Sequence, residues 1–405
     1  MDKQRILFVS EDITLAQVVR LVQLAKCLDR ELYEVHFACS DFKKLIFQGT
    51  DFIHWKIDNI GKDKMQDALD ESRPIYAEDI LEDYVQDELN LIKKVKPDFI
   101  IGDFRLSLSI SAPLSDIRFA VLINAYWSPY TNKEEYPIPD HNMVHLLGEN
   151  LAQYFFNLAR PVAFAQFARP VNSLRKKYGL RPIGSLLETL TFGDFTLHPD
   201  TPGLVPTQNP PQNHIYLGPV LWSPQGDLRL SEEDVKGRPI IYLTLGSSGK
   251  VDILPKIIEA LGGLPVYALV ATAGRKDLDN VPENILIKDF IPGSAASSLA
   301  SLVICNGGST TGYQALYEGV PILGIASNLD QYLAMSYITN AGAGKLMRAG
   351  RFKVQEFHQN IMDLLDNPTY KQAAKKIQEE FRLYNYKEIF NDVLEKALQP
   401  KEANI

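Results

Sequence analysis

At 405 residues the chain is long enough for two or three domains, and 45% hydrophobic with 23% charged residues is typical of a globular protein with buried cores. The formal net charge of −8 argues against a nucleic-acid partner, because binding to a phosphate backbone requires a basic face. The three cysteines form no pairing pattern, so we expect reduced thiols and a cytoplasmic protein. The N-terminus does not resemble a signal peptide, and no apolar run approaches the roughly 18 residues of a membrane helix.

The first half of the chain alternates predicted strands with predicted helices. Apolar residues at helical spacing, beginning after Thr14 as N-cap, predict a helix over residues 15–28, and the charged segment 62–95 is also typical of helix. Short apolar runs predict buried strands at residues 6–10, 35–39, 53–57, 99–102 and 119–123. This alternation predicts a parallel, Rossmann-like half.

Residues 126–200 depart from this alternation and are rich in aromatic residues and proline. Because small-molecule pockets are mostly apolar, we expect this segment to line a ligand pocket. The candidate lining residues are Tyr126, Trp127, His141, Tyr154 and Phe155. The alternative is a peripheral membrane contact through an amphipathic segment. The basic residues that motivate it are Arg160, Arg169, Arg175, Lys176 and Lys177.

A histidine pair in the same segment could also ligate a metal. His141 and His145 stand four residues apart, a spacing that places two side chains on one helix face. The sequence offers no evident third ligand, so we expect no metal site.

The second half begins after a polar linker, residues 222–238. Strands are predicted at residues 240–245, 266–270, 285–288, 302–305 and 322–325, and the tail 354–398 is helical in pattern. A glycine- and serine-rich turn, residues 246–249, follows the first of these strands and precedes a helix predicted near residues 253–261.

The stretch from Leu302 to Gln331 combines a strand, a glycine turn and a hydroxyl-rich helix start. Thr311 followed three residues later by Gln314 is a capping-box pattern, which predicts that a helix begins at Thr311. Free backbone N–H groups and the positive end of a helix dipole then face one point, which suits a phosphate group. Glycines allow that phosphate to approach the backbone closely.

This stretch resembles the nucleotide-sugar-binding motif of family 1 glycosyltransferases, the GT-B enzymes that include macrolide, flavonoid and glucuronosyl transferases. Their pattern is His-Gly-Gly, two variable residues, Ser or Thr, two more, Glu-Ala, three more, Gly-Val-Pro, and later Asp-Gln. The fitting positions are Gly307, Gly308, Thr311, Ala315, Gly319, Val320, Pro321, Asp330 and Gln331. Two positions depart from it, because Asn306 replaces the histidine and Gln314 replaces the glutamate.

The resemblance extends over nearly the whole chain and implies the GT-B fold, an α/β fold of two Rossmann-like parallel-sheet domains that face a central cleft. We expect an acceptor-binding domain at residues 1–220 and a linker at 221–238. The nucleotide-sugar domain is expected at residues 239–380, followed at 381–405 by a C-terminal helix that returns to the first domain.

The resemblance places the donor site in the second half, where helix N-termini and hydroxyls would stabilise the departing diphosphate without a metal. The implied phosphate-binding residues are Gly246, Ser247, Ser248, Asn306, Gly307, Gly308, Thr310 and Thr311. The implied nucleoside-binding residues are Phe290, Ile291 and Gln314, and those for the sugar hydroxyls are Asp330 and Gln331. Two local alternatives stay open: Gln314 can be the capping partner of Thr311, and Asp330 can serve a helix dipole.

Acceptor activation is where the sequence departs most from the family. The general-base histidine of the family aligns with Gln17, which cannot be a base near neutral pH and also fits a capping box with Thr14. Asp103 matches the family aspartate that orients this histidine. Three hypotheses follow: the acceptor is already acidic, as a phenol is; Asp103 or Asp12 is the base; or the protein does not catalyse transfer. An exposed aspartate with a pKa of about 4 is a weak base for an alcohol, although burial raises that pKa.

The predicted function is inverting, metal-independent transfer of a hexose to a small hydrophobic or aromatic acceptor. The donor would be a UDP- or dTDP-linked sugar, a co-substrate that needs no further cofactor. One alternative is a non-catalytic helper or binding protein, which the replacements at Gln17 and Asn306 keep open. Another is a nucleotide-sugar epimerase, which shares the fold but would need carboxylates around the sugar. The oligomeric state is left open.

Overall fold

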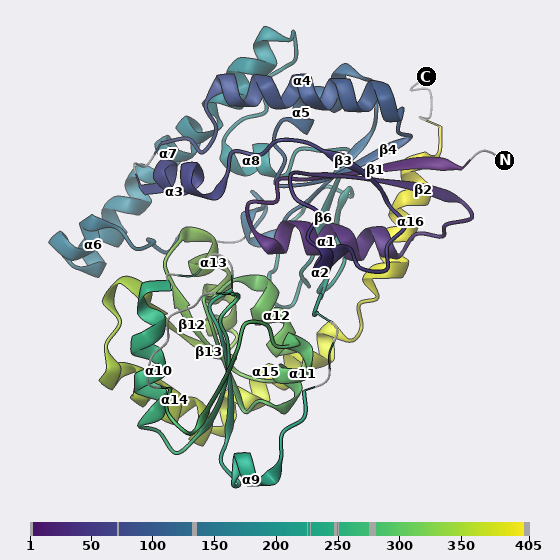
Figure 1. Cartoon of the computed structure of the whole chain (residues 1–405). Coiled ribbons are helices and arrows are strands. Elements are labelled where there is room, and N and C mark those ends of the chain that lie inside the picture. Colours follow the sequence, from purple (N-terminus) through teal and green to yellow (C-terminus); the bar gives the residue numbers. More distant parts are fainter. Residues whose placement is uncertain are drawn as a thin grey trace. The chain divides into compact units, whose positions relative to one another are not determined.

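The computed structural model describes residues 3–70, 73–131, 136–224, 226, 228–246, 249, 251–274 and 281–400 (Figure 1). The chain divides into two compact units. Unit 1 contains Met1–Asn132, Ala159–Val220 and Tyr384–Ile405, and unit 2 contains Lys133–Leu158 and Leu221–Leu383. Residues 136–158, which the sequence places in the first domain, therefore pack with unit 2.

Unit 1 is built on a seven-stranded parallel sheet of order β3-β2-β1-β4-β5-β6-β7. Its strands are β1 (Gln4–Ser10), β2 (Tyr33–Cys39), β3 (Ile53–Lys56), β4 (Phe99–Asp103), β5 (Phe119–Leu122), β6 (Phe195–His198) and β7 (His214–Tyr216). The strand order reverses between β1 and β4, and ligands of open α/β sheets gather at the carboxyl ends of the strands at such a point.

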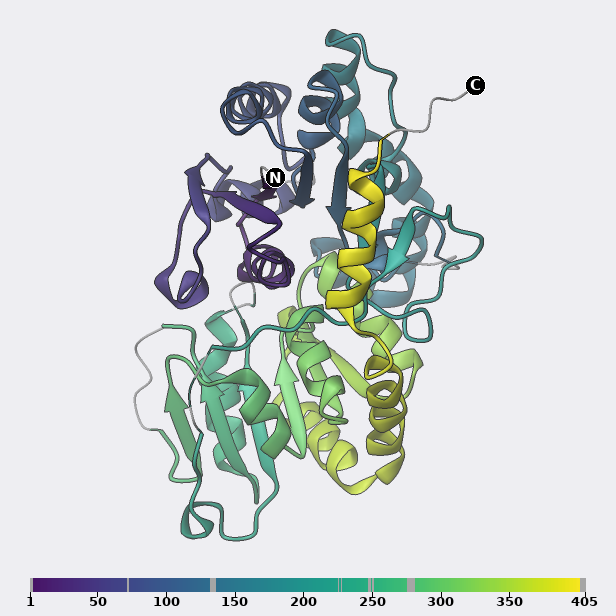
Figure 2. The ribbon, with the colours of Figure 1, turned by 90° about the vertical axis from the view of Figure 1, so that its right-hand side faces the viewer.

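Helices cover both faces of this sheet. They are α1 (Leu15–Lys26), α2 (Lys44–Phe47), α3 (Lys62–Asp70), α4 (Glu78–Val95), α5 (Leu108–Leu114), α8 (Leu186–Leu190), α16 (Tyr386–Leu398) and the 3-10 turn η1 (Ala125–Trp127). Side chains of β1 alternate between the faces: Leu7 and Val9 join a core cluster with Leu91 of α4, whereas the ring of Phe8 lies 6.3 Å from that of Phe390 in α16. Figure 2 shows α16, in yellow, beside the strands of unit 1, so the expected return of the C-terminal helix is confirmed.

Unit 2 has a six-stranded parallel sheet of order β10-β9-β8-β11-β12-β13. Its strands are β8 (Ile240–Thr244), β9 (Tyr267–Ala271), β10 (Ile285–Lys288), β11 (Leu302–Cys305), β12 (Ile322–Ala326) and β13 (Gly344–Arg348). The two parallel sheets confirm the predicted fold class.

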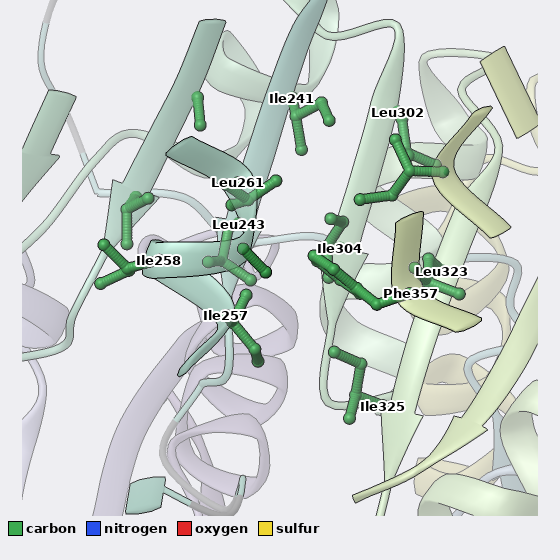
Figure 3. Close-up of a cluster of buried hydrophobic side chains, with 14 of the residues drawn as sticks. Ile241, Leu243, Ile257, Ile258, Leu261, Leu302, Ile304, Leu323, Ile325 and Phe357 are labelled. Carbon is green, nitrogen blue, oxygen red and sulfur yellow. The ribbon is translucent and has the colours of Figure 1, made fainter. Parts of the chain in front are cut away.

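Unit 2 has a core rich in branched aliphatic residues, with helices around its sheet. The elements are α6 (Asn142–Leu147), α9 (Glu232–Val235), η2 (Val251–Ile253), α10 (Leu254–Gly262), α11 (Gly293–Leu299), α12 (Ser309–Tyr317), α13 (Leu329–Asn340), η3 (Ala349–Arg351), α14 (Val354–Asp366) and α15 (Pro368–Phe381). A further helix, α7 (Glu149–Lys177), contributes its first ten residues to unit 2 and the remainder to unit 1. Figure 3 shows Leu243, Ile304 and Leu323, from three adjacent strands, packed against side chains of α10 and α14.

The predicted strands are confirmed with small shifts of their ends, but three strands were not predicted. β6 (Phe-Thr-Leu-His) and β7 (His-Ile-Tyr) include polar side chains, and β13 carries Lys345 and Arg348, so none of the three reads as a buried apolar run. The segment 62–95 forms two helices rather than one, because α3 ends at Asp70 and α4 begins at Glu78.

Candidate functional site

Two glycine turns meet at the point where the strand order of the unit 2 sheet reverses. β8 and β11 are neighbours there, and Thr244 pairs with Cys305. Gly246, with φ of +58°, follows β8, and a Cβ atom on it would lie 3.5 Å from Asn306 Nδ2 in the turn after β11. Two of the predicted phosphate-binding residues, Ser247 and Ser248, lie outside the described residues. Gly246, in the turn after β8, is thus adjacent to Asn306, in the turn after β11.

The turn after β11 is closed by Asn306, which is buried. Its Oδ1 accepts a hydrogen bond of 3.1 Å from the backbone N–H of Gly308. Gly307 has φ of +81°, and a Cβ atom there would lie 2.8 Å from Met335 Cγ, so both backbone and space require glycine. α12 then begins at Ser309 with half-buried Thr310 and Thr311 in its first turn. This is the N-terminal helix geometry that binds anions.

The predicted helix start at Thr311 is wrong, because α12 begins two residues earlier with Gly308 as its N-cap. Gln314 therefore lies within the second turn and is not a capping partner. Its Nε2 donates a hydrogen bond to the backbone oxygen of Trp222. A Cβ atom on Gly293 would lie 2.5 Å from Gln314 Oε1, so this side chain fills the space beside the start of α11. Trp222 lies 92 residues before Gln314, so no local pattern in the sequence predicts this hydrogen bond.

This geometry predicts the effect of restoring the family residue. A glutamate in place of Gln314 cannot donate to the Trp222 carbonyl and would bury a charge, so Gln314→Glu should lower the free energy of unfolding by about 1–3 kcal/mol. Urea denaturation measures the change, and Gln314→Met, which lacks the donor but adds no charge, separates the two contributions. A Gln314→Glu protein as stable as the wild type would contradict the assignment.

The predicted nucleoside residues divide into one exposed and one buried side chain. Phe290 follows β10 and is exposed, whereas Ile291 is buried. Phe290 is therefore the one of the two whose side chain is free to stack on a planar base.

The predicted sugar-binding pair lies in the first turn of α13. Gln331 is buried, and its Oε1 accepts from the N–H of Ser327 at 2.8 Å. Asn328 Oδ1 in turn accepts from the N–H of Gln331 at 3.1 Å, which completes a capping box. Gln331 thus shapes the loop after β12, while the neighbouring Asp330 is exposed.

Asp140, which the sequence did not single out, lies at the same end of the sheet. Its N–H donates to the backbone oxygen of Ser327 at 3.0 Å, and its Oδ1 accepts from the hydroxyl of Tyr332 at 3.0 Å. The next residue, His141, is exposed, and its Nδ1 accepts from the N–H of Met143 at 3.1 Å. The predicted acceptor residue His141 is therefore held in unit 2. These contacts join residues about 190 positions apart, which the sequence does not signal.

In unit 1 the candidate base Asp103 is the last residue of β4 and is fully buried. Arg20 of α1 donates two hydrogen bonds to its carboxylate, from Nε at 3.0 Å and from Nη2 at 2.9 Å. Arg20 Nη1 also donates to Asn124 Oδ1 at 2.7 Å. The carboxylate is thus the acceptor of a bidentate ion pair in the core.

The other two candidates for acceptor activation also hold local structure together. Gln17 Oε1 accepts from the N–H of Thr14 at 3.0 Å, so the capping-box alternative for Gln17 is confirmed. Asp12, with φ of +47°, accepts from the N–H and hydroxyl of Ser40 at 2.8 and 2.7 Å and from Nδ2 of Asn59. Asp12 therefore ties the loop after β1 to the loop after β2.

Comparisons with known proteins identify the family of the chain. Residues 256–387 match the family model described as Erythromycin biosynthesis protein CIII-like, C-terminal domain. The PGL/p-HBAD biosynthesis rhamnosyltransferase of Mycobacterium bovis (strain BCG / Pasteur 1173P2) is 42% identical over 381 residues, 94% of this chain and 84% of the relative. The PGL/p-HBAD biosynthesis glycosyltransferase of Mycobacterium tuberculosis (strain ATCC 25177 / H37Ra) is 41% identical over 390 residues, 94% and 89% of the two chains. The chain belongs to this family of GT-B glycosyltransferases.

The fold is also that of solved glycosyltransferases. The spinosyn rhamnosyltransferase SpnG aligns with a TM-score of 0.70 at 18% identity, covering 97% of this chain and 100% of that chain. SpnG has also been solved in complex with thymidine diphosphate and with spinosyn aglycone.

Beside Asp103, the enzyme has a second buried charge cluster at the carboxyl ends of β1 and β4. Glu11 accepts hydrogen bonds from Arg105 at 3.0 Å and from the hydroxyl of Tyr84 at 2.8 Å, and Arg105 Nε donates to Glu88 at 2.7 Å. Burial raises the pKa of Glu11 to about 7, although Arg105 and Tyr84 act in the opposite direction. The sequence did not predict this cluster, because Glu11 and Glu88 are far apart in the chain and meet through Arg105 only in the folded unit.

The raised pKa of Glu11 predicts a pH dependence of stability. The folded state binds this proton more tightly than the unfolded state, so the contribution is complete below the unfolded pKa of 4.5 and is lost as pH rises through about 7. Acidification from pH 7 to pH 5 should therefore raise the contribution of Glu11 to the free energy of unfolding by about 2 kcal/mol. Glu11→Gln should therefore lose about 2 kcal/mol more on acidification from pH 7 to pH 5 than the wild type does.

Urea unfolding at the two pH values measures this difference of differences, which is independent of any constant cost of the substitution. The exposed Glu31 offers the control, because Glu31→Gln should follow the wild type. Parallel behaviour of Glu11→Gln and the wild type would overturn the assignment.

The remaining predicted acceptor residues lie in different environments. Tyr126 is fully buried and Trp127 is nearly so, both in η1, and they can support an acceptor surface only from beneath. Tyr154 and Phe155 of α7 are exposed, with ring centroids 5.7 Å apart. Of the five basic residues nearby, Arg175 points inward, because its Nε donates to the backbone oxygen of Arg181 at 2.7 Å.

In the described part of the chain, no helix has the length and apolar character to cross a bilayer. The same residues contain no group of three or more His, Cys, Asp and Glu side chains arranged to hold a metal ion.

Proposed function

We propose that this glycosyltransferase moves a deoxyhexose, rhamnose in the first instance, from a dTDP-linked donor to a phenolic hydroxyl of a hydrophobic acceptor, with inversion at the anomeric carbon. The choice of sugar is supported by the name of the rhamnosyltransferase relative, and the choice of nucleotide by the thymidine diphosphate complex of SpnG. We expect the reaction to take place in the cytoplasm, where the three thiols stay reduced.

The donor half of the proposal is supported by the two adjacent turns of unit 2. The diphosphate would lie at the start of α12, between Gly246 and Asn306, where backbone N–H groups and the hydroxyls of Thr310 and Thr311 can donate to it. Asn306 can donate a hydrogen bond through Nδ2 but carries no charge. Asp330 is the residue we assign to the sugar hydroxyls.

The acceptor half rests on one observation: the carboxylate that matches the family aspartate, Asp103, is paired with Arg20 rather than with an imidazole. Gln17, at the family position of the histidine, cannot accept a proton. A phenol has a pKa of about 10, so far less help from a base is needed to form its anion than for an aliphatic alcohol. The phenolate would attack the anomeric carbon in line as the bond to the diphosphate breaks.

A two-stage experiment tests this function. Thermal shift with dTDP and UDP should first show stabilisation, because a ligand that binds only the folded state raises stability. Turnover is then measured with dTDP-rhamnose and a series of substituted phenols, with a primary alcohol of similar size for comparison. We expect kcat/KM to rise with the acidity of the phenol at fixed pH and the alcohol to give no product.

Equal turnover of phenol and alcohol would overturn the acidic-acceptor mechanism. Binding of dTDP without any transfer would favour a non-catalytic helper, and a change of the sugar in the absence of acceptor would favour an epimerase.

A further inference from the structure

Exposed apolar side chains concentrate in one short stretch of the chain. Of the sixteen large hydrophobic side chains that are exposed among the described residues, seven lie between residues 146 and 162. They are Leu146, Leu147, Leu151, Tyr154, Phe155, Leu158 and Val162, from α6 and the first half of α7, both labelled in Figure 1. Leu146, Val162 and Leu158 are 81%, 72% and 68% exposed. A contiguous apolar surface of this kind marks a site of interaction.

The members on α7 form a single stripe. Leu151, Phe155, Leu158 and Val162 follow one another by four, three and four residues, a spacing that places them on one face of a helix. The buried residues Ala152, Phe164 and Ala168 lie on other faces of the same helix. All four side chains of this stripe belong to one continuous helix.

The same stripe continues with positive charge. Arg169 lies seven residues after Val162 and Lys176 seven residues after Arg169, so both extend this face, and both are exposed. From Asn150 to Lys177 the sequence contains five basic residues and no acidic one, in a chain whose net charge is −8. Arg175 is buried and Lys177 pairs with Glu82, so Arg169 and Lys176 are the exposed cations on which the charge of this face depends. The helix therefore presents an apolar half followed by a cationic half on one side.

This combination fits an anionic phospholipid bilayer better than a second copy of the chain. Leucine and aromatic side chains enter the boundary between headgroups and acyl chains, while arginine and lysine meet the lipid phosphates. A symmetric contact between two α7 helices would bring Arg169 and Lys176 against a helix that has no acidic residue from 150 to 177 to pair with them.

We propose that the stripe on α7, together with the exposed leucines of α6, binds the enzyme peripherally to an anionic membrane surface. The basic half attracts the helix to the surface, and the apolar half inserts at the level of the headgroups. The binding does not depend on which acceptor the enzyme uses, although it would bring the enzyme to acceptors that reside in the bilayer.

Sedimentation of the full chain with vesicles tests the proposal. The vesicles contain phosphatidylcholine alone or phosphatidylcholine with phosphatidylglycerol, at low and at high salt. The apolar variant is Leu146→Gln with Leu158→Gln and Val162→Gln, and the charge variant is Arg169→Gln with Lys176→Gln. The matched control replaces two exposed leucines elsewhere, Leu32→Gln with Leu383→Gln.

We expect the wild type to bind the anionic vesicles at least about tenfold more tightly than the neutral ones, and binding to weaken at high salt. The charge variant should lose about fivefold in affinity for each cation removed, and the apolar variant about tenfold or more. The control should bind as the wild type does. Far-ultraviolet circular dichroism and the stabilisation by dTDP show that each variant is folded.

Failure of the wild type to bind anionic vesicles would overturn the proposal, as would wild-type binding by the apolar variant. A dimer in size-exclusion chromatography that becomes a monomer in the apolar variant, without vesicle binding by either, would instead assign the stripe to self-association.

Discussion

Asn306→Asp is expected to weaken the binding of dTDP by at least about 100-fold while leaving the fold intact. The aspartate has nearly the same shape, and its Oδ1 can still accept from the N–H of Gly308, which keeps the turn after β11 closed. Its charge, however, would face the diphosphate that we place at the start of α12. Two like charges about 4 Å apart repel by about 4 kcal/mol at an effective dielectric constant of 20, and 100-fold corresponds to about 2.7 kcal/mol.

Isothermal titration with dTDP measures the loss. Urea unfolding measures what the buried carboxylate costs in stability, so that binding is compared at a temperature at which both proteins are folded. Asn367→Asp is the matched control, because Asn367 caps α15 with its side chain and an aspartate caps equally well. It adds the same charge to unit 2 away from the two turns, so its affinity for dTDP should remain that of the wild type. Tight binding of dTDP by Asn306→Asp would remove Asn306 from the phosphate site.

The largest expected effects on stability come from the buried pair of Arg20 and Asp103. Each charge is buried and neutralised by the other, so Asp103→Asn or Arg20→Gln should lower the free energy of unfolding by about 3–5 kcal/mol. The double variant leaves neither charge uncompensated, and its cost should fall short of the sum of the two single costs by about 2 kcal/mol or more. Urea unfolding of the four proteins measures this cycle.

The same variants separate a structural role of Asp103 from a catalytic one. If Asp103 only anchors α1 to β4, the folded Asp103→Asn protein should keep kcat within about threefold at a temperature well below its melting point, with an unchanged pH profile. A loss of 100-fold or more in kcat, with a shifted pH profile and little change in stability, would make Asp103 the general base after all.

The fold could be predicted because its signals are local. Runs such as residues 302–305 are apolar on both sides, as a strand buried on both faces of a parallel sheet must be. β7 and β13 lie at sheet edges and are only partly buried, so their sequences resemble loops. Residues 136–158 belong to unit 2 because Tyr332 donates to Asp140 and Arg348 donates to the backbone oxygen of Ile138, and the sequence does not signal pairings across about 200 residues.

The donor motif could be predicted for a similar reason, since its residues are close in sequence and their spacing sets the strand, turn and helix. Partners at long range were not predictable. Gln314 matched a local capping pattern but binds the backbone of Trp222, and Asp103 matched a family aspartate but binds Arg20. In both cases the residue type suited two roles, and the partner selected one of them.

The sequence by itself thus determined the alternation of strands and helices, the glycine turn after β11 and the family to which the chain belongs, because short-range spacing and backbone freedom fix these features. The tertiary structure alone determined which polar side chains remain accessible for chemistry. Buried polar groups must find hydrogen-bond partners, and those partners come from distant parts of the chain. For that reason Gln17, Asp12 and Asp103 hold unit 1 together, while Asp330 is exposed at the start of α13.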